Sequence, residues 1–408
     1  MNFLLIGPFG IYALFRVSLP LFWCLDFLYT HGLNNDASEL VLMHAFYLIF
    51  QGGLFFLLMV YIVTLANRHR AKRRFEPYIE FHNKNATRHA QFALAGILLF
   101  FVLNYQDLPI FSGGGSDAIM RLGEEQKVKT WFMYGLLGAL SYILMFAIVY
   151  MKSKKQRYAW GVVLVIASIV TAKKAAIIGV FGKFILLYFI LAAIKPRMPV
   201  FKVAAILIVS VLFIVYQFSR TVGFDYDFSD ILQIFVSLVY SSATTYLVQL
   251  IDLDGVSYAA QYSERLGSYG TLSYIFNPFL KLLFGTGIYK APGPYLGEML
   301  FNSNAANGAN LTLFFEYIFI FGGHYFALLA ILHMLVMVLL AKFFIRKIII
   351  STHTNILVTT TYFSLFMACF MFLFDSLNTW RSLPFILFPF MVYIFSKCLH
   401  ISFTKKVV

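Results

Sequence analysis

The sequence predicts an all-α, polytopic integral membrane protein, and three observations lead to this fold class. The chain has 408 residues, of which 61% are hydrophobic and 12% are charged, whereas soluble domains are about 45–50% apolar and about 25% charged. Apolar runs close to the ~20 residues of a membrane-spanning helix recur along the chain. Basic residues gather in alternate loops between these runs. We therefore expect a single membrane domain over 1–408, built as a bundle of about 10–12 spans.

The expected spans follow from the apolar runs, taken in chain order. They lie near 3–27, 42–66, 90–106, 131–151, 158–172, 176–194, 203–219, 323–345, 355–375 and 383–399. The stretch "MNFLLIGPFGIY" has no basic region and no small-residue cleavage site, so we expect the first span to stay uncleaved. The run 158–172 is short, and 230–252 could span the membrane, re-enter it or lie flat at its surface.

The lysines and arginines predict the orientation. Most of the 32 basic residues fall in "RHRAKRRFEPYIEFHNKNATR", "KSKKQR", "KPRMPVFK", "KFFIRK" and the C-terminal tail. Positively charged loops stay in the cytoplasm, so both termini are expected inside. The net charge of +14 is thereby explained as topology, and no nucleic-acid partner is expected.

The long segment 220–322 then falls outside the cytoplasm. It holds four basic and eight acidic residues, and a loop of this length is usually functional. Its Gly, Pro, Asn and Tyr content predicts ordered turns around a site. Cys24, Cys369 and Cys398 are scattered and predict neither a disulfide nor a zinc framework.

Lys173 and Lys174 interrupt the apolar stretch "ASIVTAKKAAIIGVFG" and are predicted at the outer surface. Charge on this side opposes the positive-inside preference and is costly within a membrane. Two interpretations stay open. The side chains could snorkel to lipid headgroups, or they could bind an anionic ligand.

Glu316 lies in the apolar run "NLTLFFEYIFIFGG", just before a Phe-Gly-Gly break, at the predicted outer membrane boundary. Partial desolvation is expected to raise the pKa of such a carboxylate toward the range of a general base. The competing interpretation is a structural carboxylate paired with an arginine.

Three arginines are predicted at the same outer level: Arg220, Arg265 and Arg381. Arginine offers a planar fork for phosphate, so their convergence with Lys173 and Lys174 suggests a pyrophosphate clamp. Each arginine taken alone could equally form a structural ion pair. The "DYD" and "DLD" spacings at 225–227 and 252–254 could hold Mg²⁺ or Mn²⁺, but two acids at this spacing are a weak signal, and we expect no metal.

These residues, in this order, resemble the oligosaccharide repeat-unit polymerases, the Wzy-like O-antigen polymerases of bacterial envelopes. The similarity lies in "TAKKAAIIGVFGKFILLYFIL", "RLGSYGTLSYIFNPFLKLL", "FEYIFIFGG" and "WRSLP". Lys173 or Lys174 stands where this family more often has arginine. The resemblance implies a GT-C-like helix bundle with one large periplasmic loop, in the bacterial inner membrane.

The resemblance also implies a reaction: glycosyl transfer from a growing chain on undecaprenyl pyrophosphate to a new lipid-linked repeat unit, without a metal or other cofactor. The implied partners are undecaprenyl-pyrophosphate-linked oligosaccharides, membrane lipids, a Wzz-like chain-length regulator and a flippase. Glu316, Arg220, Arg265 and Arg381 would be the catalytic residues. Lys173, Lys174, Arg220 and Arg381 would bind the pyrophosphate.

Three other functions remain alternatives to polymerisation. An O-antigen ligase uses the same donor but usually carries a histidine ahead of the Gly-rich turn, where this chain has Asn307 and Asn310. A lipid-linked oligosaccharide flippase or other transporter would predict internal repeats and charges at the bilayer midplane. A membrane scaffold would need none of the outer charges.

Overall fold

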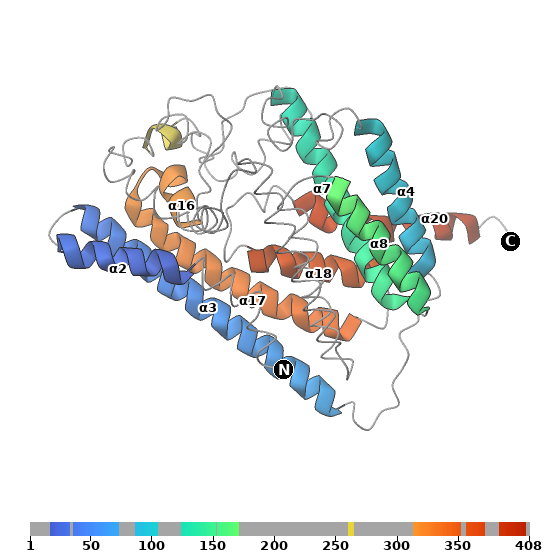
Figure 1. Cartoon of the computed structure of the whole chain (residues 1–408), viewed down its shortest axis with the longest axis horizontal. Helices are drawn as coiled ribbons and strands as arrows, with labels where there is room; N and C mark the ends of the chain where they lie inside the picture. The colour runs from blue at the N-terminus through green and yellow to red at the C-terminus, as the bar shows by residue number, and fades with distance from the viewer. Residues whose placement is uncertain are drawn as a thin grey trace, which may run out of the picture. The chain divides into compact units, whose positions relative to one another are not determined.

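The computed structural model of the chain describes residues 17–32, 36–72, 86–104, 124–151, 153–170, 260–264, 313–351, 356–371 and 383–404. Within these ranges every regular element is a helix, and no strand forms. The predicted all-α class is therefore confirmed for the described part of the chain (Figure 1).

The helices follow one another along the chain as in Figure 1. They are α2 (Leu19–His31), α3 (Asp36–Lys72), α4 (Ala86–Asn104), α7 (Glu124–Tyr150), α8 (Lys154–Val170), α16 (Leu313–Phe321), the 3₁₀ helix η5 (His324–Ala327), α17 (Leu328–Ser351), α18 (Ile356–Met371) and α20 (Leu383–Thr404). A short helical turn also covers 260–264.

Three described segments are long and apolar enough to cross a membrane: Ser38–Leu65 in α3, Ala86–Leu103 in α4, and Tyr325–Ile348 in η5 and α17. They coincide with the spans expected near 42–66, 90–106 and 323–345. The described part of the chain therefore contains helices with the length and apolar character of membrane spans, as its composition predicted.

Other expected spans correspond to helices with shorter apolar parts. These parts are Gly135–Tyr150 in α7, Ile356–Phe370 in α18 and Pro384–Cys398 in α20. Residues 158–170 of the expected short span 158–172 lie in α8, and residues 171 and 172 lie outside the described residues.

The remaining expected spans are covered only in part, or not at all, by the described residues. Of the span expected near 3–27, residues 3–16 lie outside the described residues, and the described part lies mostly in helix α2, which has Pro20 in its first turn and ends at His31. The candidates 176–194, 203–219 and 230–252 lie outside the described residues.

Basic side chains sit at those helix ends that were predicted to face the cytoplasm. The exposed ones are Arg68, Arg88, Lys154, Lys155, Arg346, Lys347 and Lys397. Two of them lie over aromatic rings one helical turn earlier: Lys347 Nζ is 5.4 Å from the Phe343 ring centroid, and Lys397 Nζ is 5.9 Å from that of Tyr393. A long apolar stem with its charged end at the helix terminus is the arrangement of a snorkelling side chain.

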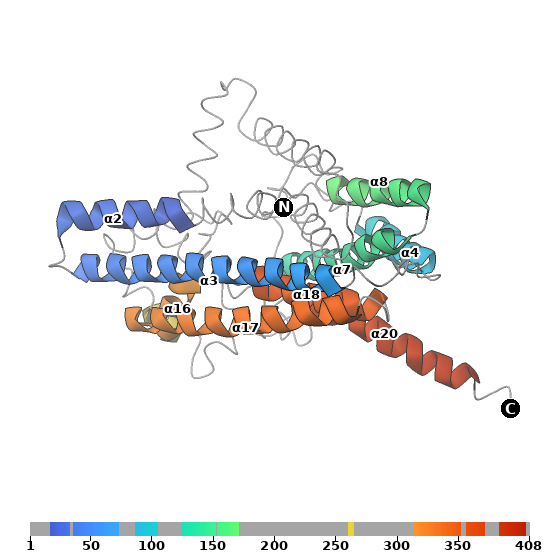
Figure 2. The ribbon, with the colours of Figure 1, turned by 90° about the horizontal axis from the view of Figure 1, so that it is seen from below.

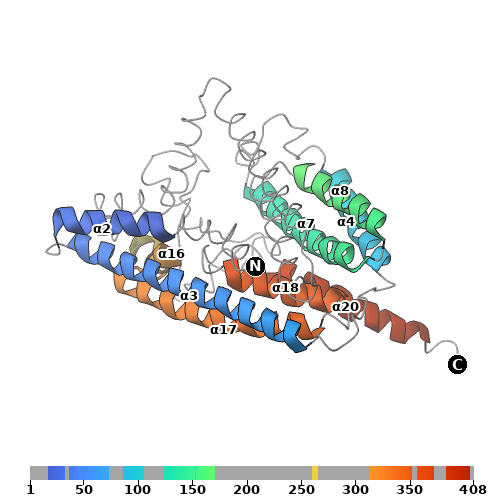
Figure 3. The same cartoon turned by 60° about the horizontal axis from the view of Figure 1, so that its bottom comes forward.

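The chain divides into two compact units, each built from separate stretches of sequence. The first comprises Met1–Tyr61, Leu207–Leu340 and Cys369–Arg381, and the second Ile62–Ile206, Ala341–Ala368 and Ser382–Val408. In the first unit, α2 runs alongside the N-terminal half of α3, which runs alongside α17 (Figures 1, 2 and 3).

In the second unit, α7 is the central helix and packs against α4, α8 and α20. Two glycines allow close approach between these helices. A Cβ at Gly96 would lie 2.7 Å from Leu140 Cδ1, and a Cβ at Gly135 would overlap the ring of Phe385. Small residues at helix contacts are typical of membrane bundles, where they let backbones come close.

The three cysteines are free thiols in different surroundings. Cys24 and Cys369 are buried, whereas Cys398 near the end of α20 is exposed.

Candidate active site around Glu316

The candidate site is built on α16, a helix of nine residues that precedes the spanning segment of η5 and α17. All residues from Leu313 to Ile320 except Tyr317 are buried. The apolar sequence "LFFEYIFIF" explains this burial, because such a helix gains by removing its large side chains from water. A helix this short is only marginally stable alone, so its packing decides whether it forms.

The Gly-Gly break predicted from the sequence ends this helix. Gly322 has φ +72° and donates its backbone N–H to Ile318 O at 2.8 Å. A left-handed residue that closes such a bond is a common way to end a helix and strongly favours glycine. Gly323 is extended and leads directly into η5.

Glu316 lies in the first turn of α16 with only 2% of its surface exposed. Its neighbours along the chain, Phe315 and Phe314, are fully buried. A carboxylate in such surroundings is expensive unless other groups interact with it. Glu316 is therefore the most unusual acidic side chain in the described part of the chain, and the sequence had singled it out.

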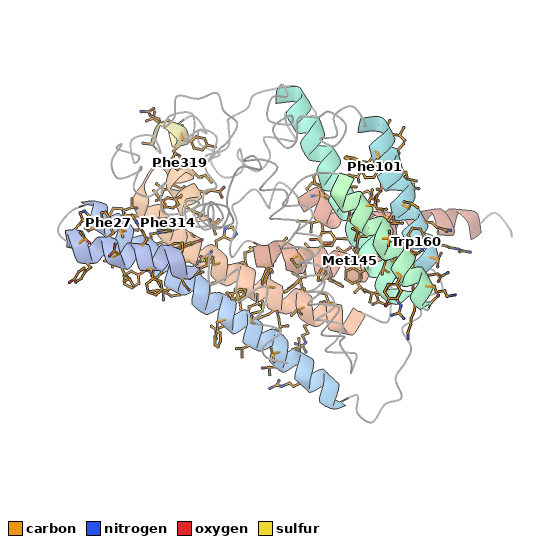
Figure 4. All side chains as sticks on the ribbon, viewed as in Figure 1. Phe27, Phe101, Met145, Trp160, Phe314 and Phe319 are labelled. Atoms are coloured by element: carbon orange, nitrogen blue, oxygen red, sulfur yellow. The ribbon has the colours of Figure 1, made fainter. Side chains whose placement is uncertain are left out.

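One side of α16 packs against α3 through aromatic rings. His44, which is fully buried, has its ring centroid 5.0 Å from Phe314 and 5.2 Å from Phe315. Tyr47 approaches Phe314 at 5.4 Å, and Cys24 Sγ of α2 lies 3.5 Å from His44 Nδ1. Figure 4 labels Phe314 beside α2 and α3.

A second contact joins α16 to α17. The hydroxyl of Tyr317 lies 2.8 Å from His333 Nδ1, and the two rings meet edge to face with centroids 6.0 Å apart. Burial, and then the negative charge of Glu316, raise the pKa of Tyr317 to about 12. The phenol therefore keeps its proton at neutral pH, so its O–H can donate to Nδ1.

Tyr317 also begins a stack of aromatic rings that continues past the glycines. Its ring lies 5.6 Å from that of Phe321, which in turn lies 5.1 Å from Phe326. Tyr317 is partly buried, whereas Phe321 and Phe326 are exposed. The stack thus extends from beside Glu316 to the surface.

The turn at 260–264 packs against the end of α16. Ser263 Oγ donates to the Ile320 carbonyl at 2.9 Å. Tyr262 is buried, and its ring lies edge to face with Phe319 at 5.9 Å. A piece of the long segment predicted outside the membrane therefore lies against the helix that carries Glu316, which also bears the labelled Phe319 in Figure 4.

Of the predicted site residues, the structure describes Glu316 alone. The others, Arg220, Arg265, Arg381, Lys173 and Lys174, lie outside the described residues. The same holds for the acids at 225–227 and 252–254. Among the described side chains, no group of three His, Cys, Asp or Glu residues is placed to hold a metal ion.

His44 and His333 are neighbours of the site that the sequence analysis did not single out. Each interrupts the apolar run of an expected span, His44 near 42–66 and His333 near 323–345. An ionisable residue inside a spanning segment is itself a signal of a special role or partner. The sequence therefore marks both histidines as unusual, but it does not indicate which helix each imidazole contacts.

Comparisons with known proteins find no similar protein. No protein-family model matches the chain, and neither the curated proteins nor the solved structures that were searched contain a match.

Proposed function

We propose that this protein polymerises lipid-linked oligosaccharide repeat units at the outer face of a bacterial inner membrane, as a metal-independent glycosyltransferase. The observation that carries the proposal is Glu316, a carboxylate buried in a short helix immediately ahead of a spanning segment. The sequence resemblance to repeat-unit polymerases supports the same assignment.

In the proposed reaction, Glu316 takes the proton of an acceptor sugar hydroxyl as that oxygen forms a bond to the anomeric carbon of the donor. The bond from this carbon to the pyrophosphate oxygen breaks, and its electron pair leaves with undecaprenyl pyrophosphate. A diphosphate is a good leaving group, so positive charge matters more than a proton donor on its side. Arg220 and Arg381, with Lys173 and Lys174, would supply that charge, and Arg265 would add to it.

Lipid-linked substrates need a site at the membrane boundary. Helix α16 precedes the spanning segment that starts at Tyr325, and the turn at 260–264 packs against it. A reacting hydroxyl brought to Glu316 would therefore be close to both the membrane and the predicted outer segment. We infer the protein's natural partners to be undecaprenyl-pyrophosphate-linked oligosaccharides, membrane lipids, a flippase and a Wzz-like chain-length regulator.

Replacing Glu316 by glutamine tests the proposal directly. Glu316→Gln keeps the size and hydrogen-bonding capacity of the side chain but removes the base. Polymerisation by protein reconstituted with lipid-linked repeat units should fall by roughly 10²–10⁴-fold. Glu316→Asp should retain part of the rate, because the base is kept but displaced.

Two outcomes would contradict this assignment. A parental rate for Glu316→Gln would make Glu316 structural, as an ion-pair partner for one of the arginines. Transfer of a finished chain to lipid A core, with no growth of the lipid-linked chain, would favour the ligase. Movement of the lipid-linked unit across the bilayer without new glycosidic bonds would instead identify a transporter.

A further inference from the structure

Glu316 lies between two anchored faces of α16. Phe315 and Tyr317 are two positions apart, so they project about 200° apart around the helix axis. The ring of Phe315 packs on His44 of α3, and Tyr317 is hydrogen-bonded to His333 of α17. Glu316 is about 100° from each of them, so its direction depends on how closely these two contacts constrain the helix, whose C-terminal end is also held by Ser263.

The two contacts differ in how closely they constrain the rotation of α16 about its axis. Ring packing between His44 and the phenylalanines at 314 and 315 is tilted, with interplanar angles of 53° and 43°, and such contacts tolerate small rotations. The bond from Tyr317 to His333 joins two atoms at 2.8 Å and weakens steeply when misaligned. Of the two contacts, only the hydrogen bond therefore fixes the rotation of the helix closely.

We propose that Tyr317 and His333 are positioning residues of the Glu316 site, because their hydrogen bond fixes the rotation of α16 and thereby the direction of the Glu316 carboxylate. This inference rests on the proposed function, since it assigns Glu316 the role of base. Neither residue needs to touch the substrate. Each acts through the helix that carries the carboxylate.

The kinetic test removes the hydrogen bond from each side in turn. Tyr317→Phe removes the hydroxyl and retains the stack on Phe321, and His333→Leu removes the imidazole nitrogen. Each should lower kcat roughly 10- to 100-fold, because small displacements of a reacting group are costly, while KM for the acceptor changes by less than about twofold. His333→Asn places an amide oxygen near the position of Nδ1 and should restore most of kcat.

A double-mutant cycle asks whether the two side chains act as one pair. Tyr317→Phe combined with His333→Leu should be no slower than either single variant. Tyr362→Phe in α18 is the matched control, since it removes a phenol from another part of the fold, and it should keep the parental kcat. Parental kcat in Tyr317→Phe, or full additivity of the two losses, would overturn the inference.

A second measurement does not depend on polymerisation. A hydrophobic carbodiimide modifies carboxyl groups in apolar surroundings, and mass spectrometry can follow its addition to Glu316. Loosening α16 should speed this labelling several-fold in Tyr317→Phe and in His333→Leu, but not in His333→Asn or Tyr362→Phe. Unchanged labelling in the first two variants would overturn the inference.

The two proposals can therefore fail separately. If the parental protein makes no polymer, or Glu316→Gln matches it, the proposed function or the base role fails, and the labelling rates still decide whether the pair orients the carboxylate. If the parental protein polymerises and Glu316→Gln does not, but Tyr317→Phe behaves as the parent in both assays, the positioning role alone is wrong.

Discussion

Glu316 is the one charged residue of the apolar helix α16. Its side chain is 2% exposed in a helix that otherwise consists of Leu, Phe, Ile and Tyr. Hydrophobic packing alone would be served better by leucine at this position. Burying the charge of Glu316 costs free energy, and Glu316 makes an interaction that offsets part of this cost. Under the proposed function, Glu316 is the catalytic base.

The proposed pyrophosphate clamp gives a prediction at this scale. Arg220→Ala or Arg381→Ala should abolish polymer formation while the protein still inserts in the membrane. Lysine at either position should rescue poorly, because the bidentate fork is lost. The measurement is the length of the lipid-linked glycan ladder on a gel.

Arg68→Ala is a suitable control for the clamp. Arg68 is exposed near the predicted cytoplasmic end of α3, so its removal should leave the ladder unchanged. Ladders of near-normal length in both Arg220→Ala and Arg381→Ala would remove the clamp hypothesis.

Gly322 and Gly32 share a left-handed backbone conformation. Both have positive φ, +72° and +73°, but their surroundings differ. A Cβ at Gly322 would lie 3.1 Å from Ser263 Cβ and 3.3 Å from Ala260 Cα, whereas at Gly32 nothing lies within 4 Å. Gly32→Ala should cost about 1–2 kcal/mol from the left-handed backbone alone, and Gly322→Ala should cost more.

Thermal unfolding in detergent, followed by circular dichroism, would measure this difference as two melting temperatures. Equal losses for the two variants would mean that the turn at 260–264 yields without cost and does not clamp the end of α16.

At the scale of helices, α7 carries a matched pair of glycines three positions apart. Gly135→Ala would press a methyl group into the ring of Phe385 on α20, whereas Gly138→Ala would meet nothing within 4 Å. Overpacking should destabilise the first variant by about 1–3 kcal/mol. The second should be neutral, or more stable by up to ~1 kcal/mol, because alanine favours a helix.

Chemical unfolding of the purified protein in detergent would give both free energies. Equal stability of the two variants would show that α20 does not pack closely on α7 at Gly135.

The helices were also the part of the fold that the sequence predicted best. Apolar runs placed the long apolar segments of α3, α4 and of η5 with α17 within a few residues, because such a segment is defined by length and apolar composition, and both can be read along the chain. Helix α16 was not separated from the long segment 220–322. Its nine residues are too few for a span, and only contacts with distant residues such as His44, Tyr262 and His333 stabilise it.

The candidate site could be predicted only in part for the same reason. Glu316 stands out locally as an acid in an apolar run next to two glycines. The pairing of Tyr317 with His333, and the packing of His44 on Phe314 and Phe315, depend on which helices become neighbours. Neither the spacing nor the composition of the chain contains that information.

At the scale of the whole molecule, the prediction concerns topology. A reporter fused near Asn304 should be extracytoplasmic, and one fused near Lys72, at the end of α3, should be cytoplasmic. The reason is the segregation of basic residues into alternate loops. Fusions to an alkaline phosphatase and to a fluorescent protein would measure both positions, and a cytoplasmic signal near Asn304 would rule out a site at the outer face.

The accessibility of the native cysteines reports whether the chain is folded. Cys24 is 0% and Cys369 is 5% exposed, whereas Cys398 is exposed. A maleimide dye should therefore modify one thiol per folded molecule and three after denaturation. The ratio of the two signals measures the folded fraction without engineered labels, and every variant discussed above keeps all three cysteines. If a variant loses polymer but keeps the parental labelling ratio, the variant is folded and its catalysis is impaired. If a variant loses polymer and already labels three thiols before denaturation, it is unfolded.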